Sequence, residues 1–415
     1  MTASIFTAIF LFALLVSAGM RLWLSLRQAK YVARHRDRVP AAFAGSIALT
    51  DHRRAAAYTL AKGKLGRIEL ILSTIWLLIL TLGGGLQYLH GIAAQWLDPG
   101  NLWHGVVLFG LLAAVGFIYD LPLTLYGIFN LEARFGFNRM TPKMFVMDTL
   151  KQLALALVIG TPVLWAVLWL MQGMGANWWA WVWALWLGLN LVTMVVYPLF
   201  IAPLFNKFSP LADESVKTRV EALLTRCGFR SKGLFVMDGS KRSAHGNAYF
   251  TGFGAGKRIV FFDTLLSSLQ PTEVEAVLAH ELGHFKHHHL WKRIAVMGTA
   301  VLALLWALGF LIRQDWFYQG LGVQAHSNAL ALILFSMILP VLLFPLTPLT
   351  SMWSRKHEFE ADAYACKQAN SRDLVTALVK LYKENASTLT PDPLHSLFYD
   401  SHPPASIRIA RLQGQ

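Results

Sequence analysis

The sequence predicts a mainly helical integral membrane protein, and three observations carry this prediction. Of the 415 residues, 55% are hydrophobic and only 14% are charged, whereas soluble globular chains are typically about 25% charged. The mean hydropathy is +0.46. Seven apolar stretches approach or exceed the ~20 residues with which a helix crosses a bilayer: Ile5–Leu24, Ile68–Tyr88, Trp103–Asn130, Gln152–Met171, Trp178–Phe205, Ile294–Ile312 and Ala329–Thr350.

The first apolar stretch is predicted to be an anchor and not a signal peptide. No basic residue precedes it, and Arg21, Arg27 and Lys30 follow its core. The net charge of +14 does not predict nucleic-acid binding, because Lys and Arg gather in loops between apolar runs. The two cysteines have no CxxC spacing and exclude a disulfide framework.

Loop charges predict the orientation of the spans. Lys and Arg are abundant after the first, third and fifth stretches and in the C-terminal tail, whereas Gly91–Leu102 and Gln172–Asn177 contain none. The positive-inside rule then predicts an outer N-terminus and a cytoplasmic C-terminus. We expect four parts: residues 1–205 with spans one to five and basic cytoplasmic loops, 206–293 as a cytoplasmic metalloprotease segment, 294–350 as a transmembrane hairpin of spans six and seven, and 351–415 as a cytoplasmic segment.

The stretch AHELGHFKHHHLW, Ala279–Trp291, carries the motif HExxH. Pro271-Thr272-Glu273 is typical of a helix start, so His280 and His284 should share one helical face and reach one metal ion. Zinc accepts two such imidazoles. Glu281 would lie beside the ion, where its carboxylate can take a proton from a metal-activated water.

The third ligand is not in this stretch. A long zincin motif would require Gly at 287 and His at 290, where this chain has His287 and Leu290. Without that glycine turn we expect the helix to continue, so that His288 lies ~12 Å along the axis from His280. We interpret His287, His288 and His289 as a polar cuff at the membrane surface; a second metal or a pH-dependent role is the alternative.

The segment SRKHEFEADAYA, Ser354–Ala365, offers the missing carboxylate. On a helix, Glu358 and Asp362 share a face, and Glu360 lies about 200° round. We predict that Glu358 is the third zinc ligand and that Asp362 accepts the far N–H of a ligand histidine. Because a transmembrane hairpin separates the two motifs, the site would be built at the cytoplasmic membrane surface.

Three rival interpretations remain. A transporter or scaffold with a structural zinc would need four protein ligands, and the sequence offers three. An intramembrane protease would carry HExxH inside an apolar span, whereas Phe285–His289 is polar. A chain without activity is disfavoured by the intact motifs.

The whole chain resembles the zinc-dependent type I CAAX prenyl endopeptidases, gluzincins that include the a-factor-converting membrane protease. The shared blocks are FGFNRMTPKMFVMDTLK (Phe135–Lys151), YPLFIAPLFNKFSPL (Tyr197–Leu211), NAYFTGFGAGKRIVFFDTLL (Asn247–Leu266), HELGH, EFEADAYA and SHPPASIRIARL (Ser401–Leu412). The resemblance implies seven helices around a chamber, closed by a cytoplasmic gluzincin-type metalloprotease domain with a small β element.

The resemblance also implies roles for residues. His280, His284 and Glu358 would bind one zinc ion per chain and Glu281 would be the base, as the spacing argument indicates. Asn247 would hold the substrate backbone, Arg408 would line the cleft, and His402 would steady the oxyanion. The expected partners are membrane lipid and a peptide or protein substrate, lipidated or not. A composition typical of bacteria predicts the bacterial inner membrane, where broad quality control of membrane proteins is the alternative to prenyl specificity.

Overall fold

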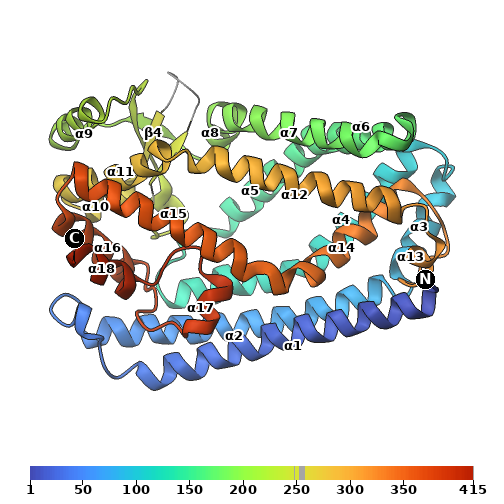
Figure 1. Ribbon diagram of the computed structural model, residues 1–415, viewed down its shortest axis with the longest axis horizontal. Helices are drawn as coiled ribbons and strands as arrows, with labels where there is room; N and C mark the ends of the chain where they lie inside the picture. The colour runs from blue at the N-terminus through green and yellow to red at the C-terminus, as the bar shows by residue number, and fades with distance from the viewer. Residues whose placement is uncertain (247, 252–257, 415) are drawn as a thin grey trace.

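Long apolar helices lie along the longest axis of the molecule, and most polar elements gather at one end of them (Figure 1). The computed structural model describes residues 1–246, 248–251 and 258–414. The long helices are α1 (Ala3–His35), α2 (Leu49–Leu80), α4 (Leu102–Tyr126), α5 (Pro142–Leu155), α6 (Thr161–Gly173), α7 (Trp178–Val196), α12 (His289–Leu311), α14 (Asn328–Leu343) and α15 (Thr347–Gln368), with α3 (Gly85–Trp96) and α13 (Asp315–Gln319) at the opposite end.

The number of spans agrees with the sequence prediction. Within the described residues, six helices are long and apolar enough to cross a membrane, and a bent pair raises the number to seven. Several spans are prolonged or joined by π-helical turns, at Gly127–Glu132, Ala156–Gly160 and Tyr197–Ile201, the last leading into α8 (Ala202–Phe205). Short 3-10 turns lie at Ala41–Phe43, Gly175–Asn177, Gly239–Lys241 and Phe344–Leu346.

The predicted second span, Ile68–Tyr88, is not one straight helix. It divides into α2 and α3, which meet at an angle of 54°. The glycines between them explain the break: Gly84 has a φ of +75°, and a Cβ on Gly83 would lie 2.8 Å from the backbone oxygen of Ile79. A chain with side chains at these positions would resist such a turn.

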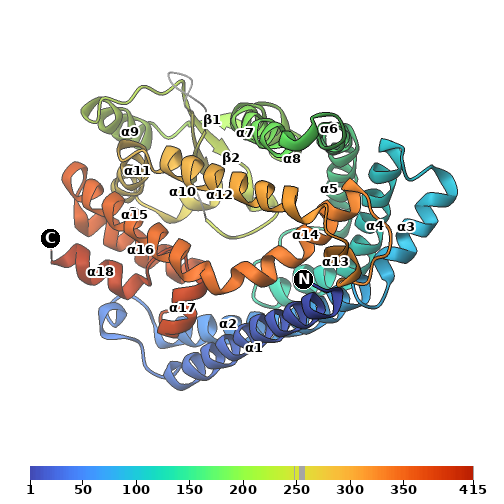
Figure 2. The ribbon, with the colours of Figure 1, turned by 45° about the vertical axis from the view of Figure 1, so that its right-hand side comes forward.

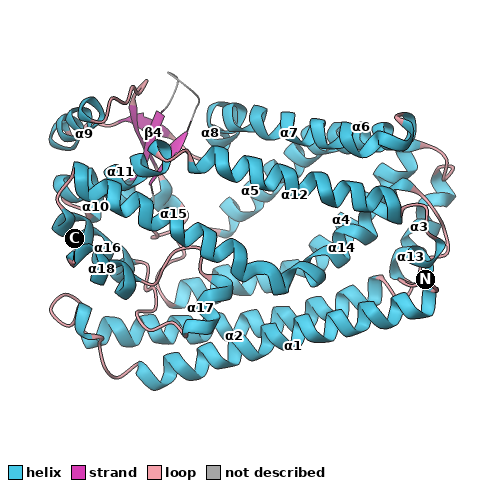
Figure 3. Cartoon of the chain, viewed as in Figure 1, coloured by secondary structure: helices cyan, strands magenta, loops and turns pink. Residues whose placement is uncertain are grey.

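The polar end combines a small sheet with short helices (Figure 3). Its strands are β1 (Phe208–Pro210), β2 (Leu234–Met237), β3 (Ala248–Thr251) and β4 (Arg258–Phe262), in the order β1-β2-β4-β3. Among the described strands, β2 and β4 are the one parallel pair, and β3 is an edge strand antiparallel to β4. The helices here are α9 (Glu214–Arg226), α10 (Asp263–Ser268), α11 (Pro271–Lys286), α16 (Ser371–Glu384), α17 (Pro393–Tyr399) and α18 (Ala405–Gln413).

Two main apolar clusters stabilise the two regions. One unites the spans around residues such as Leu108, Leu168 and Leu334. The other packs α9, β4, α11 and α16 together through Leu223, Phe261, Leu282 and other buried side chains. Apolar burial at the polar end therefore fixes α11 from several sides.

Charged residues at membrane depth face a cavity. Glu69 of α2 and Asp120 of α4 line the same cavity of about 610 Å³ as Arg21 and Arg67. A second cavity of about 570 Å³ shares Ser25, Gly63 and His395 with it. Ionisable groups in spans are tolerated where they face such polar space, and the adjoining cavities lie along α1 and α2.

Candidate active site

The helix that carries HExxH begins where the sequence predicts. Pro271 occupies its first turn, and Gln270 and Glu273 form a reciprocal capping box that satisfies backbone donors at the N-terminus. The carboxylate of Glu273 also pairs with Lys380 of α16 at 2.7 Å. Leu278 and Leu282 face the core. These contacts hold α11 rigidly, with one face directed at α15.

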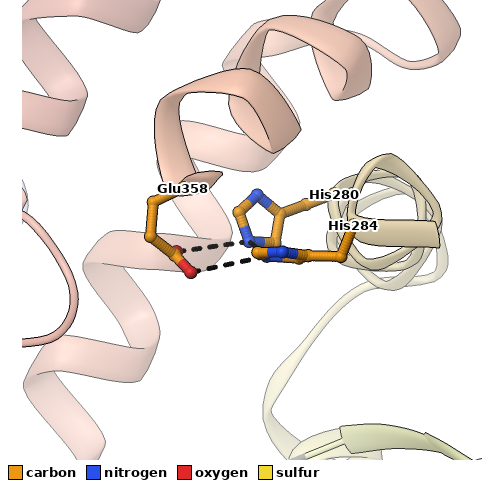
Figure 4. A group of neighbouring side chains, drawn as sticks. All are labelled: His280, His284 and Glu358. Atoms are coloured by element: carbon orange, nitrogen blue, oxygen red, sulfur yellow. Dashed lines mark hydrogen bonds and ion pairs between the residues drawn. The ribbon is translucent and has the colours of Figure 1, made fainter. Parts of the chain in front are cut away.

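His280, His284 and Glu358 converge on one point (Figure 4). The two histidine Nε2 atoms lie 3.3 Å apart. Glu358 Oε1 is 3.4 Å from His284 Nε2, and Glu358 Oε2 is 3.5 Å from His280 Nε2. Tetrahedral ligands bonded to zinc at ~2.0–2.1 Å are themselves about 3.4 Å apart. The two imidazoles and the carboxylate can therefore each offer one atom to a single tetrahedral ion, which leaves a fourth position for other ligands.

Close contact between α11 and α15 makes this convergence possible (Figure 2). Gly283, between the two histidines, lies against Ala361, between Glu358 and Asp362. A Cβ on Gly283 would be 2.8 Å from the Ala361 Cα atom. Our sequence reasoning missed this glycine, although a glycine inside a helical motif is a signal of close backbone approach.

Asp362 and Arg408 lie behind His280. Asp362 Oδ1 is 2.8 Å from His280 Nδ1, and it also accepts from Arg408 Nη2 at 2.5 Å. Arg408 Nη1 lies 3.7 Å from Glu358 Oε2. The resemblance implied that Arg408 lines the cleft, but this residue is only 6% exposed. Its guanidinium is engaged by two buried carboxylates, which leaves little of it for a substrate.

The carboxylates also set the protonation of His280. Burial alone would lower the pKa of this imidazole, but hydrogen bonds with Asp362 and Glu358 outweigh burial and raise the pKa to about 9. Negative charge thus dominates the pocket, which is the electrostatic condition that attracts a cation.

Glu281 and His402 are both less buried than Glu358. Glu281 follows His280 on α11 and is half-buried. The side chain of His402 is 63% exposed, and its Nε2 lies 3.5 Å from Glu358 Oε1. The structure thus brings His402 to the three convergent residues from a segment more than a hundred positions away from HExxH. Asn247 lies outside the described residues.

The predicted continuation of α11 to His288 is wrong. The helix ends at Lys286, and His288 adopts a left-handed conformation with a φ of +56°. Histidine tolerates this conformation better than most residues do. The turn starts α12 and brings His289 back to His284, whose Nδ1 is 3.0 Å from His289 Nδ1. His289 is therefore buried and is not part of an exposed polar cuff.

Comparison with known proteins identifies the family. Residues 28–207 match the family described as CAAX prenyl protease N-terminal, five membrane helices, and residues 210–415 match peptidase family M48. A CAAX prenyl protease 1 homolog of Arabidopsis thaliana is 39% identical over 77% of this chain and 76% of its own. CAAX prenyl protease 1 of Saccharomyces cerevisiae is 37% identical over 73% of this chain and 70% of its own length.

A solved structure agrees over nearly the whole length. The crystal structure of S. mikatae Ste24p superposes with a TM-score of 0.90 at 30% identity and covers 98% of each chain. The HExxH helix, the convergent carboxylate and the multi-span architecture are thus explained together: the chain belongs to peptidase family M48 and is a membrane zinc metalloprotease.

Proposed function

We propose that His280, His284 and Glu358 hold one zinc ion per chain and that Glu281 is the general base of peptide hydrolysis. The observation that carries this proposal is the convergence of the three side chains. The two imidazole Nε2 atoms lie 3.3 Å apart, and the two oxygens of Glu358 lie 3.4 Å from His284 Nε2 and 3.5 Å from His280 Nε2. Two imidazoles and one carboxylate form the donor set of catalytic zinc sites that keep a fourth position open.

The surrounding side chains have separate tasks. A zinc ion held there supplies Lewis acidity to the scissile carbonyl and to the attacking water. Glu281 takes the proton of that water and returns it to the leaving amine. His402 donates from Nε2 to the oxygen on which negative charge develops. Asp362 accepts from His280 Nδ1 and fixes its tautomer, and Arg408 neutralises Asp362 and Glu358.

We further propose that the substrate is an extended chain at the membrane surface. The edge position of β3 supports main-chain pairing with a peptide, and Asn247, just before β3, would hold its backbone. The similar proteins are named CAAX prenyl proteases, so a prenylated C-terminal peptide is the proposed class. A further cavity of about 430 Å³ is lined by Leu14, Leu77, Val341 and other apolar side chains, together with Arg21 and several hydroxyl groups, and its apolar part has the character that a lipid chain requires.

The four-part division of the chain and its orientation belong to the same proposal. The two termini lie at opposite ends of the long axis (Figure 1), which supports termini on opposite sides of the membrane; the outer N-terminus and the cytoplasmic site rest on the basic loops. The bacterial inner membrane stays a prediction from composition.

The experiment offers three substrates to zinc-loaded protein in detergent: a farnesylated C-a-a-X peptide, its unlipidated twin and an unfolded membrane protein. Loss of the last three residues from the lipidated peptide alone is the expected result. Cleavage regardless of lipid would replace prenyl specificity with broad quality control. No cleavage of any of the three by wild type would contradict the proposed reaction and favour a scaffold or transporter.

A further inference from the structure

A second group of side chains adjoins the proposed metal site on the side of His284. His289 Nδ1 is 3.0 Å from His284 Nδ1, and His289 Nε2 is 2.8 Å from Glu360 Oε2. His289 is only 5% exposed, and its ring stacks on that of His357 with centroids 4.0 Å apart. None of these three residues has a task in the hydrolysis described above.

The positions of the protons follow from the contacts, given the proposed function. If His284 binds the ion through Nε2, its Nδ1 carries a proton and must donate. His289 Nδ1 is then the acceptor, so the proton of neutral His289 is on Nε2. That N–H points at the carboxylate of Glu360, which accepts. Both contacts are satisfied by this one arrangement of protons.

We infer that Glu360 and His289 form a relay that fixes the tautomer and orientation of His284. The two ligand histidines are thus supported differently: His280 donates directly to a carboxylate, Asp362, whereas His284 reaches its carboxylate through an intervening imidazole. Both carboxylates and the ligand Glu358 belong to one helix, α15. Glu360 lies about 200° round that helix from Glu358. One face of α15 therefore provides the ligand carboxylate, and the opposite face provides the carboxylate of the relay.

The same cluster could instead bind a second metal, since ligand atoms of His289, His357 and Glu360 lie within 4.8 Å of one another. Two observations oppose this. An ion on His289 Nε2 would leave a proton on Nδ1, which would face the Nδ1 proton of His284 at 3.0 Å, two donors without an acceptor. In addition, the rings of His289 and His357 are inclined by only 12°. A ligand metal lies near the plane of each imidazole, and two stacked planes share no such point.

The test is the metal affinity of detergent-purified variants, measured by competition with a zinc chelator. His289→Phe keeps an aromatic ring to stack on His357 but removes both nitrogens, so we expect affinity to fall roughly 10- to 100-fold. His289→Gln can accept and donate in the same places and should restore most of it. The matched control is His357→Phe, which preserves the stack and should bind zinc as wild type does.

A spectroscopic measurement separates positioning from general damage. In the cobalt-loaded protein, the visible ligand-field band reports how the histidines meet the ion, and it should change in His289→Phe but not in His357→Phe. If His289→Phe does not fold, Glu360→Ala and Glu360→Gln give the same comparison, with affinity lost in the first and retained in the second.

The outcomes distinguish the relay from the function on which it rests. His284→Ala should lose the metal; if it does not, the proposed ligand set fails. If His284→Ala loses the metal while His289→Phe and Glu360→Ala bind it as wild type does, only the relay fails. Two zinc ions per wild-type chain, reduced to one by His357→Phe, would overturn the relay in favour of a second metal site.

Discussion

At the scale of single residues, peptide cleavage is proposed to depend on a carboxylate that binds no metal. Glu281 lies between His280 and His284 in sequence but one position round the helix from His280, so it would be directed beside an ion that the two histidines hold. A glutamine there has nearly the same shape and cannot accept the proton of the attacking water. The two functions of the motif, metal binding and proton transfer, should therefore separate by mutation.

Glu281→Gln should lower kcat by roughly 10²- to 10⁴-fold while leaving zinc content unchanged. Turnover of a cleavable peptide and metal content by atomic emission would be measured on the same sample. His284→Ala is the comparison and should lose both. Retained turnover in Glu281→Gln would remove this residue from the role of base.

Arg408 should be important for stability and not only for the site. It lies between Asp362 and Glu358, all three almost fully buried. Removing one member of a buried charge group leaves the others unpaired, at a cost of about 3–5 kcal/mol. Arg408→Met should therefore lower the thermal unfolding temperature strongly and weaken metal binding.

The matched control is an exposed pair. Lys217 and Glu214 lie 3.1 Å apart on α9, with side chains 39% and 75% exposed. Such pairs contribute about 0–1 kcal/mol, so Lys217→Met should hardly change the unfolding temperature. Equal changes of the unfolding temperature in Arg408→Met and Lys217→Met would show that the buried charge group does not stabilise the fold.

The ligand residues could be predicted from the sequence because helical spacing fixes which side chains share a face. HExxH fixes the relative position of two histidines because both lie on one helix, and the i, i+4 spacing of Glu358 and Asp362 does the same for α15. The relay was out of reach because it depends on one backbone conformation, the left-handed His288, that turns His289 back towards His284. No periodicity predicts such a turn at a histidine.

At the scale of elements, the site exists because α11 and α15 approach each other closely. Their contact is formed by Gly283 and Ala361, one residue before His284 and three after Glu358. The bend between α2 and α3 also depends on glycine, because a Cβ on Gly83 would lie too close to the backbone of Ile79. Hydropathy predicted an apolar span there and could not show that Gly83–Gly85 breaks it, because a hydropathy average does not register backbone conformation.

Gly283→Ala should separate the two ligand helices. The added methyl group would meet backbone atoms of Ala361, so a helix has to move, and overpacking of this kind costs about 1–3 kcal/mol. We expect a lower unfolding temperature and weaker zinc binding, because Glu358 moves away from the histidines. Both are measurable on the protein purified in detergent.

A helical glycine in open space is the control. A Cβ on Gly91 of α3 meets no atom within 4 Å, so Gly91→Ala should be neutral or stabilise by up to about 1 kcal/mol through helix propensity. Wild-type zinc affinity in Gly283→Ala would contradict the close-contact explanation.

At the scale of the whole molecule, ion pairs fasten the polar end to the spans. Arg27 of α1 pairs with Asp392, at the start of α17, at 2.9 Å. Arg242, beside the sheet, pairs with Asp148 of α5 at 2.8 Å. The 33 residues of α1 extend about 50 Å, more than the ~30 Å of a bilayer core. This helix is therefore long enough to reach beyond the membrane and to hold the proposed catalytic end at its surface.

The orientation predicts the accessibility of the two termini. A C-terminal tag should be protected from membrane-impermeant reagents added to intact cells and become reactive after permeabilisation, whereas an N-terminal tag should react from the start. Protection follows from the basic loops, which the positive-inside rule places in the cytoplasm. Labelling of the C-terminal tag in intact cells would reverse the proposed topology.

The central claim is that one zinc ion is held by two imidazoles and one carboxylate with a position left open. X-ray absorption at the zinc edge, combined with metal content, tests it most directly on the purified protein. We predict one zinc ion per chain, about two nitrogen ligands from histidine at ~2.0–2.1 Å, and loss of bound zinc in His284→Ala. An ion enclosed by four protein ligands, or bound equally well in His284→Ala, would contradict the proposed site.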